Sequence, residues 1–150
     1  MLIVHIKSIR RLAVLGGGAA LLVVLLVVLA GCLGKGTPEQ QEIPAGTNEE
    51  RLSYLTGLGW QAEEQPVETL SLELPQDLPG EYTALQERQG FPFSQFGGRV
   101  VSRYTYTVTN YPDCPGQVQA NLYVCDGLLI GGDVTAPGQD GFVRELAFPE

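Results

Sequence analysis

The first 33 residues combine a basic start with a long apolar run. The run from Leu12 to Leu33 contains no charged residue, every charged residue before it is basic, and the next acidic residue is Glu39. It closes with the tetrapeptide Leu-Ala-Gly-Cys, which ends at Cys32 and matches the bacterial lipobox. A basic segment, an apolar segment and small residues before a cysteine are typical of a lipoprotein export signal. We therefore predict that residues 1–33 are a signal peptide or membrane anchor, with Cys32 as the lipid attachment site.

The same run is long enough to stay in the membrane. As a helix of 22 residues it would extend roughly 33 Å, against a hydrocarbon core of about 30 Å. It is also longer than the apolar part of a typical cleaved signal, which has about 7–15 residues. An uncleaved transmembrane helix with its basic end in the cytoplasm is therefore an open alternative. Both interpretations attach the chain to the cell membrane and place its C-terminal domain outside the cytoplasm.

A polar segment separates the apolar run from the folded part. Residues 34–46 are rich in Gly, Pro, Glu and Gln and contain one large apolar residue, Ile43, so we expect a flexible linker. The next four residues, Thr47-Asn48-Glu49-Glu50, have the Thr-x-x-Glu form of a capped helix start. Leucines follow at helical spacing, and Gly59 is a typical helix end. We expect the adjacent Trp60 to anchor the core.

Three further segments show recognisable patterns. Alternating leucines predict a half-buried strand at 67–74, and a short helix is expected at 80–89, with Tyr82 and Leu85 facing inward. The loop 91–98 carries three phenylalanines, which we expect to cover the core.

The C-terminal half predicts an antiparallel meander. Residues 99–111 and 118–124 alternate apolar and polar side chains, and Asp126-Gly127 is typical of a two-residue hairpin turn into a third strand at 128–134. The apolar residues of the first two strands are expected to share a face and to pack against Leu52, Leu55 and Trp60; they include Tyr104, Tyr106, Leu122 and Val124.

These elements together predict an α+β domain over residues 47–150. It would contain a small antiparallel sheet of about four strands, ending in the C-terminal meander, with two helices packed on one face. The apolar signal or anchor helix of residues 1–33 and the linker of residues 34–46 would precede it.

Charge narrows the possible partners. After Cys32 there are seventeen acidic and six basic residues, a net charge of −11, whereas the whole chain carries −8. Phosphate backbones and anionic lipid head groups repel such a domain. We therefore expect no nucleic-acid partner, and contact with the membrane only through the N-terminal anchor.

Several blocks of the domain resemble a known bacterial family. The blocks are Tyr54-Leu55-Thr56-Gly57-Leu58-Gly59-Trp60, Leu85-Gln86-Glu87-Arg88-Gln89-Gly90-Phe91, Arg103-Tyr104-Thr105-Tyr106-Thr107-Val108-Thr109-Asn110-Tyr111-Pro112, and the tail Gly131-Gly132-Asp133-Val134 with Asp140-Gly141-Phe142. In this order, over about residues 48–146, they are similar to the domain of unknown function 4830. The resemblance implies a membrane-tethered bacterial protein with no assigned activity, and many such relatives keep an uncleaved membrane helix.

The exported part lacks the residues of several common active sites. The only histidine, His5, precedes the apolar run, so the domain has no imidazole for a nucleophile pair or a typical zinc site. Asp126, Asp133 and Asp140 are separated by apolar residues rather than by alternating oxygen ligands, so they do not have the pattern of a calcium loop. We expect no cofactor, no metal and no catalytic residue.

Two functions fit these observations. We favour a non-catalytic binding or sensory module at the bacterial cell envelope, with a protein or another envelope component as its ligand. Its binding surface would be an exposed edge strand or the polar side of the meander, which consists of Arg103, Thr105, Thr107, Gln119 and Asn121. The alternative is an extracytoplasmic hydrolase that uses two carboxylates, and a deep pocket enclosing two such groups would favour it.

The two cysteines of the domain are predicted to be free thiols. Export favours disulfides, but Cys114 lies at the tip of the predicted hairpin, and Cys125 lies about opposite Arg103. Their separation of about eight residues along the ladder corresponds to over roughly 20 Å, whereas a disulfide allows about 7 Å between Cα atoms. We expect Cys114 to be exposed and Cys125 to be at least half covered.

Overall fold

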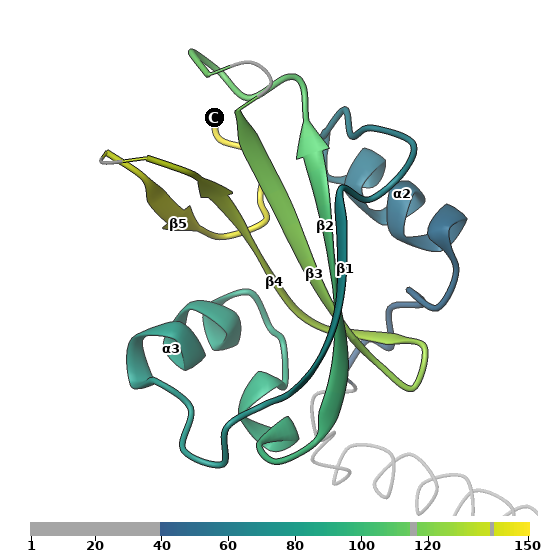
Figure 1. Ribbon diagram of the computed structural model, residues 1–150, viewed down its shortest axis with the longest axis vertical. Helices are drawn as coiled ribbons and strands as arrows, with labels where there is room; N and C mark the ends of the chain where they lie inside the picture. Colours follow the sequence, from purple (N-terminus) through teal and green to yellow (C-terminus); the bar gives the residue numbers. More distant parts are fainter. Residues whose placement is uncertain (1–39, 115–116, 139) are drawn as a thin grey trace, which may run out of the picture. The chain divides into compact units, whose positions relative to one another are not determined.

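The computed structural model of the protein describes residues 40–114, 117–138 and 140–150. In this part, five strands form one antiparallel sheet in which every strand pairs with its neighbour in sequence (Figure 1). The elements are α2 (Asn48–Gly57), β1 (Glu68–Glu73), α3 (Gly80–Arg88), the 3₁₀ helix η1 (Phe93–Phe96), β2 (Val100–Val108), β3 (Val118–Cys125), β4 (Leu128–Ala136) and β5 (Phe142–Arg144). The domain is therefore α+β, as predicted, with one strand more than expected.

The predicted signal or anchor at 1–33, including Cys32, lies outside the described residues. The described part begins at Gln40, within the predicted linker. Of the helices that the structure describes, none is both long enough and apolar enough to cross a membrane.

Helix α2 begins with the capping box that the sequence predicts. The N–H of Glu50 donates to Thr47 Oγ1 at 3.2 Å, and the N–H of Thr47 donates back to Glu50 Oε2 at 3.0 Å. The chain turns beyond the helix at Gly59, whose φ of +100° lies in the left-handed region that glycine tolerates. Trp60 is 2 % exposed and donates from Nε1 to Leu146 O at 2.7 Å, so it anchors the core as expected.

The first face of the sheet carries the predicted core. The register pairs Tyr104 with Leu122 and Tyr106 with Ala120, so the apolar residues of β2 and β3 share a face as expected. Helix α2 packs on this face (Figure 1). The core there consists mainly of Leu55, Trp60, Tyr106, Val108, Val118, Ala120, Leu122, Val134 and Leu146.

The two helices lie on opposite faces of the sheet, which corrects the expectation that they share one face. Helix α3 and η1 cover the second face (Figure 1), where a separate apolar cluster is formed by Leu74, Phe93, Val101, Cys125 and Ile130, with Tyr82 and Tyr123 packed against it. The physical reason is that the second face is only partly polar. Val101, Tyr123 and Cys125 lie together at one end of this face, and Thr105, Thr107, Gln119 and Asn121 lie at the other. The apolar end is shielded from water only if another element covers it.

Two adjacent glycines in β4 allow close packing on both faces. A Cβ atom at Gly131 would lie 2.6 Å from the Phe93 ring, and one at Gly132 would collide with Leu146. Phe93 belongs to the second-face cluster and Leu146 to the first-face core. The glycine pair is therefore a packing feature, next to a β-bulge in the pairing of β3 with β4.

The edges of the sheet differ from expectation. Leu70 in β1 is 41 % exposed, whereas the alternating leucines predicted a half-buried strand. The reason is that β1 is an edge strand that pairs only with β2 among the described residues. At the other edge, the short β5 pairs with the end of β4 and was not predicted.

The β3–β4 turn and the cysteines agree with the sequence in most respects. Asp126 and Gly127 both have positive φ values, 51° and 78°, as the predicted two-residue turn requires. Both cysteines are free; Cys125 is buried, and Cys114 is half-buried rather than exposed. Because Val124 pairs with Ser102, Cys125 lies closer to Val101 than to the predicted Arg103.

Candidate ligand-binding site

The predicted polar face is present, but its centre is buried. Thr105 pairs with Asn121 and Thr107 pairs with Gln119, so these four side chains and Arg103 lie on one face. Thr105 is 3 % exposed and Asn121 9 % exposed, and Thr105 Oγ1 donates to Asn121 Oδ1 at 2.7 Å. The other three residues are half-buried at the margin of the face, where they remain candidates for ligand contacts.

A chain of hydrogen bonds extends from this pair to helix α3. We call Thr105, Asn121, Asp133 and Tyr82 the polar ladder. Asn121 Nδ2 donates to Asp133 Oδ1 at 2.8 Å, and the Tyr82 hydroxyl donates to Asp133 Oδ2. Burial raises the pKa of Asp133, and the two hydrogen bonds and the charge of Arg103 oppose that effect. The side chains at the centre of the predicted face, Thr105 and Asn121, therefore form internal hydrogen bonds. Through Asp133 these bonds connect α3 to the sheet.

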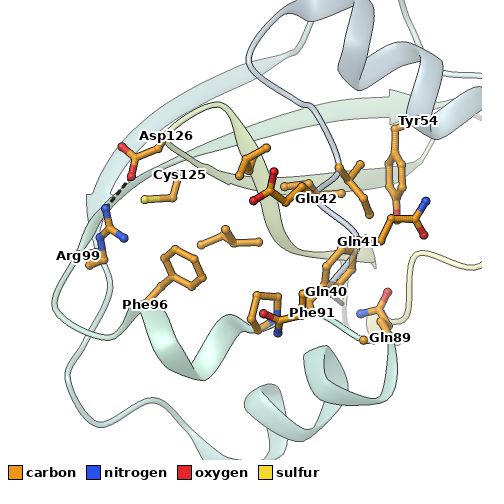
Figure 2. Close-up of a pocket in the computed structure, with 16 residues that line it drawn as sticks. Gln40, Gln41, Glu42, Tyr54, Gln89, Phe91, Phe96, Arg99, Cys125 and Asp126 are labelled. Carbon is orange, nitrogen blue, oxygen red and sulfur yellow. Dashed lines mark hydrogen bonds and ion pairs between the residues drawn. The ribbon is translucent and has the colours of Figure 1, made fainter. Parts of the chain in front are cut away.

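A separate cavity of about 480 Å³ lies beside the start of the domain (Figure 2). We call it the linker groove, because one wall is the chain that continues from the predicted linker. It is lined by residues 40–43, Tyr54 of α2, residues 89–92 after α3, Phe96, Arg99, and residues 125–126 and 128–130 of the β3–β4 hairpin.

The linker groove has polar ends and apolar walls. Figure 2 shows Arg99 and Asp126 at one end and Tyr54 and Gln89 at the other. Arg99 Nη2 donates to Asp126 Oδ2 at 2.7 Å, so the cation at that end is already paired. The apolar lining consists of Ile43, Phe91, Pro92, Phe96, Leu128, Leu129 and Ile130. A cavity with these features can enclose an amphipathic molecule.

Two glutamines, Gln89 in the groove lining and the buried Gln86, bind β4. Gln89 Nε2 donates to Gly132 O at 3.0 Å, and Gln89 Oε1 accepts from the N–H of Leu146 at 2.7 Å. The buried Gln86 accepts from the N–H of Gly132 at 2.8 Å. These two side chains satisfy backbone groups of β4 that a neighbouring strand would otherwise pair. The groove wall at α3 is therefore fixed by the sheet itself.

The opposite wall is the end of the linker, and backbone hydrogen bonds attach it to the β3–β4 hairpin. Leu129 donates its N–H to Ile43 O, and Ala45 donates its N–H to Gly127 O, both at 2.9 Å. Arg51 adds a bond from Nη1 to Ala45 O at 2.9 Å. The linker thus begins to pair with the sheet before the domain predicted to start at residue 47.

The groove contains two carboxylates and one thiol. Its carboxylates, Glu42 and Asp126, are both exposed, and Asp126 is paired with Arg99. A general acid needs a carboxyl group that stays protonated, and burial is the usual cause. Burial also raises the pKa of Cys125, which favours the less nucleophilic thiol form. In the described part of the chain, no group of three or more His, Cys, Asp or Glu side chains could hold a metal ion.

The groove was not predicted from the sequence. Its linker wall was expected to be flexible, although Ile43, the single large apolar residue of that segment, was an available signal. The polar ladder was half predicted: Thr105 and Asn121 were named as part of a binding face, but Tyr82 was expected only to face inward. Asp133 was named only in the block that resembles a known family and as a calcium ligand that the spacing does not support. Tyr82 and Asp133 are 51 residues apart in the chain, so no sequence spacing indicates that they are in contact.

The chain has no match among family models, curated protein sequences or solved structures. The resemblance to the domain of unknown function 4830 therefore stays a prediction from the sequence blocks.

Proposed function

We propose that the protein is a membrane-tethered, non-catalytic binding or sensory module of the bacterial cell envelope, and that it binds a small ligand in the linker groove outside the cytoplasm. The observation that supports this most directly is the joint construction of the groove. Residues 40–43 form one wall, and residues 89–92 after α3 form the other together with the β3–β4 hairpin. A ligand between them touches both the folded domain and the chain that leads to the predicted anchor.

The size and charge of the groove indicate the kind of ligand. Its volume of about 480 Å³ lies within the range of about 300–1,000 Å³ that is usual for small-molecule sites. The lining contains Glu42, Asp126 and a single cation, Arg99, which Asp126 already neutralises. Together with the net charge of −11 after Cys32, this disfavours an anionic ligand. We therefore propose a neutral, amphipathic ligand.

Sensing would follow from movement of the part of the linker wall that precedes its attachment to the sheet. Residues 43–45 are held against the hairpin by backbone hydrogen bonds, whereas residues 40–42 are exposed. A ligand that contacts residues 40–42 and the opposite wall would therefore stabilise the arrangement in which these residues lie against the groove. A ligand shifts such an equilibrium only by its difference in affinity for the two states. Contact with both walls supplies that difference.

The hydrolase alternative would use Glu42 and Asp126, since these are the two carboxylates in the groove. It requires one of them to act as an acid and the other as a base or nucleophile. The ion pair of Asp126 with Arg99 and the exposure of both side chains give neither residue the protected environment of a general acid. We therefore place binding ahead of hydrolysis.

The experiment compares two probes with the same alkyl chain. Full-length, ¹⁵N-labelled protein in phospholipid nanodiscs is titrated with hexyl β-glucoside, which is neutral, or hexyl sulfate, which is anionic. Hexyl β-glucoside should shift the amide signals of Gln89, Gly90 and Ile130, and hexyl sulfate should shift them much less. Equal effects of the two probes, or no effect of the neutral one, would refute the proposal.

A groove-filling variant and a matched control locate the binding. Leu128→Trp places a larger side chain in the lining and should abolish the shifts, whereas Val143→Trp, at an exposed position of β5, should leave them unchanged. The same mixtures are assayed for released glucose. Release that is lost in Glu42→Gln or Asp126→Asn would favour the hydrolase instead.

A further inference from the structure

In the part of the chain that the structure describes, the outer side of β1 is an unpaired sheet edge. The sheet order places β1 at one end, with β2 as its only strand neighbour among the described residues. Five of the six residues of β1 are exposed, Leu72 being the exception. Natural edge strands are commonly protected by proline, lysine or a bulge within the strand. In β1 the central residues, Thr69 to Leu72, include neither proline nor lysine.

The hydrogen bonds at the end of β1 show which backbone groups face outward. Leu74 donates its N–H to Arg99 O at 2.9 Å and accepts from the N–H of Gly98 at 2.8 Å, so both of its backbone groups face β2. Backbone groups alternate sides along a strand. The N–H and C=O groups of Thr69, Ser71 and Glu73 therefore face away from the sheet, where an added strand could pair with them.

The surroundings of this edge are strongly acidic. Residues 61–87 contain seven acidic residues and no basic one. Glu68 and Glu73 occupy the two ends of β1, and both are exposed. The nearest cation, Arg103 on the neighbouring strand, donates to Glu68 at 2.5 Å and so compensates only one of these charges.

This charge acts against self-association and for a basic partner. Antiparallel pairing of two β1 edges would bring two acidic surfaces together, which is unfavourable. A strand with lysine or arginine near its ends would meet opposite charges instead. Between the charged ends, Leu70 is 41 % exposed and offers an apolar contact on one face.

We propose that the outer edge of β1 is a docking site for an extended, basic segment of a partner protein, which adds to the sheet as a sixth strand. Main-chain hydrogen bonds to Thr69, Ser71 and Glu73 would hold the segment, and the acidic residues around β1 would select its charge. This surface is distinct from the linker groove, so the inference does not depend on a ligand in that groove.

The test uses two peptides that differ only in charge. One has eight residues, with two valines at the centre, lysine at both ends and threonine elsewhere; in the other, glutamate replaces lysine. Each is added at millimolar concentration to the full-length protein in nanodiscs. The lysine peptide should slow amide hydrogen exchange at Thr69, Ser71 and Glu73, and the glutamate peptide should not.

A proline substitution separates strand addition from simple charge attraction. Ser71→Pro removes an outward N–H without removing a bond to β2, so the fold should persist, while the lysine peptide should bind at least about tenfold more weakly. Ser71→Ala keeps the N–H and should bind normally. Circular dichroism checks the fold of both variants.

Each outcome decides the proposal. Slowed exchange with the lysine peptide alone, together with loss of binding in Ser71→Pro, supports it. No binding, equal binding of both peptides, or unchanged binding in a folded Ser71→Pro overturns it. Should Ser71→Pro fail to fold, the exchange measurement on the natural chain decides alone, because protection confined to the outward amides is specific to an added strand.

Discussion

The hydroxyl of Tyr82 on α3 donates a hydrogen bond to the carboxylate of Asp133 on β4, and this contact links the helix to the middle of the sheet. Asp133 is 3 % exposed and also accepts from Asn121 Nδ2. Burial raises the pKa of Asp133 above its usual value, although the hydrogen bonds and the charge of Arg103 oppose this. The charged form of Asp133 is therefore disfavoured in the folded state.

The contribution of Asp133 to the stability of the protein should fall as pH rises through the range in which this residue ionises. With a raised pKa, the folded state binds more protons than the unfolded state above about pH 4, so ionisation lowers the free energy of unfolding. Asp133→Asn removes this effect. Relative to the natural protein, the variant should gain stability with rising pH, by about 1.4 kcal/mol for each unit by which the pKa is raised. Urea unfolding at pH 4 to 8 measures the difference.

Two controls test whether the effect belongs to this contact. Asp77→Asn changes an exposed aspartate and should leave the pH dependence nearly unchanged. Tyr82→Phe removes one donor from the buried carboxylate and should cost about 1–3 kcal/mol at neutral pH, but less when combined with Asp133→Asn. A pH profile of Asp133→Asn that runs parallel to that of the natural protein would contradict the assignment.

Local signals predicted much of the fold, because their causes are local. The capping box at Thr47, the left-handed Gly59 and the Asp126-Gly127 turn each depend on contacts within a few residues. The placement of α3 on the second face depends instead on Tyr82 meeting Asp133 and on Phe93 packing against Gly131, pairs that are far apart in the chain. Alternation on β2 and β3 predicts an apolar face and a polar one, and the polar face was expected to be open to a ligand rather than covered by a helix.

The candidate site was harder to predict than the fold for a similar reason. The linker groove is formed by segments that are far apart in sequence, and the pairing of residues 43–45 with residues 127–129 brings the linker and the hairpin together. The polar face, by contrast, was identified correctly as a set of residues that share a side of the sheet. The centre of this face is buried because α3 covers it. Alternation within the strands does not indicate whether a helix covers a face.

Leu122 is the best test of the predicted core. Its side chain is fully buried on the face that α2 covers, between β2 and β4. Leu122→Ala should lower the free energy of unfolding by about 2–5 kcal/mol, as large-to-small core substitutions do. Val143→Ala, at a position that is 54 % exposed, should change it by about 0.5 kcal/mol or less. A loss below about 1 kcal/mol for Leu122→Ala would show that this face is not the core.

Arg51 holds the end of the linker against the sheet. Its guanidinium donates to Tyr106 Oη and Ala45 O, both at 2.9 Å, and lies 3.6 Å from the centre of the Tyr104 ring. Arg51→Lys keeps the charge but cannot supply this planar set of donors. We expect a loss of about 2 kcal/mol or more in stability, with faster amide exchange at Ala45 than elsewhere.

Arg144→Lys is the matched control for Arg51. Arg144 also donates to a tyrosine hydroxyl, that of Tyr111 at 2.7 Å, and lies over a ring, that of Phe142. Because Arg144 is exposed, its replacement should cost about 1 kcal/mol or less. Equal losses for the two substitutions would mean that the buried position of Arg51 has no special role.

The two thiols of the domain should react at different rates. Cys114 is half-buried, whereas Cys125 is 5 % exposed and has a raised pKa, chiefly through burial. Iodoacetamide should therefore label Cys114 first in the native protein, and label both residues in denaturant without reductant. Peptide mapping by mass spectrometry distinguishes the sites. Labelling of Cys114 and Cys125 only after reduction would show that they are disulfide-bonded and would contradict the structure.

The mature protein should begin at Cys32 with a lipid on its thiol. The tetrapeptide ending at Cys32 and the basic residues before the apolar run support this expectation. Stable attachment requires two or more acyl chains, since a single chain binds a membrane only marginally. Mass spectrometry of the membrane-extracted protein should show both the new terminus and the acyl mass, and Cys32→Ser should accumulate as the uncleaved chain. An intact Met1 with an unmodified Cys32 would instead establish the transmembrane helix as the anchor, and Cys32→Ser would then be indistinguishable from the natural protein in size and location.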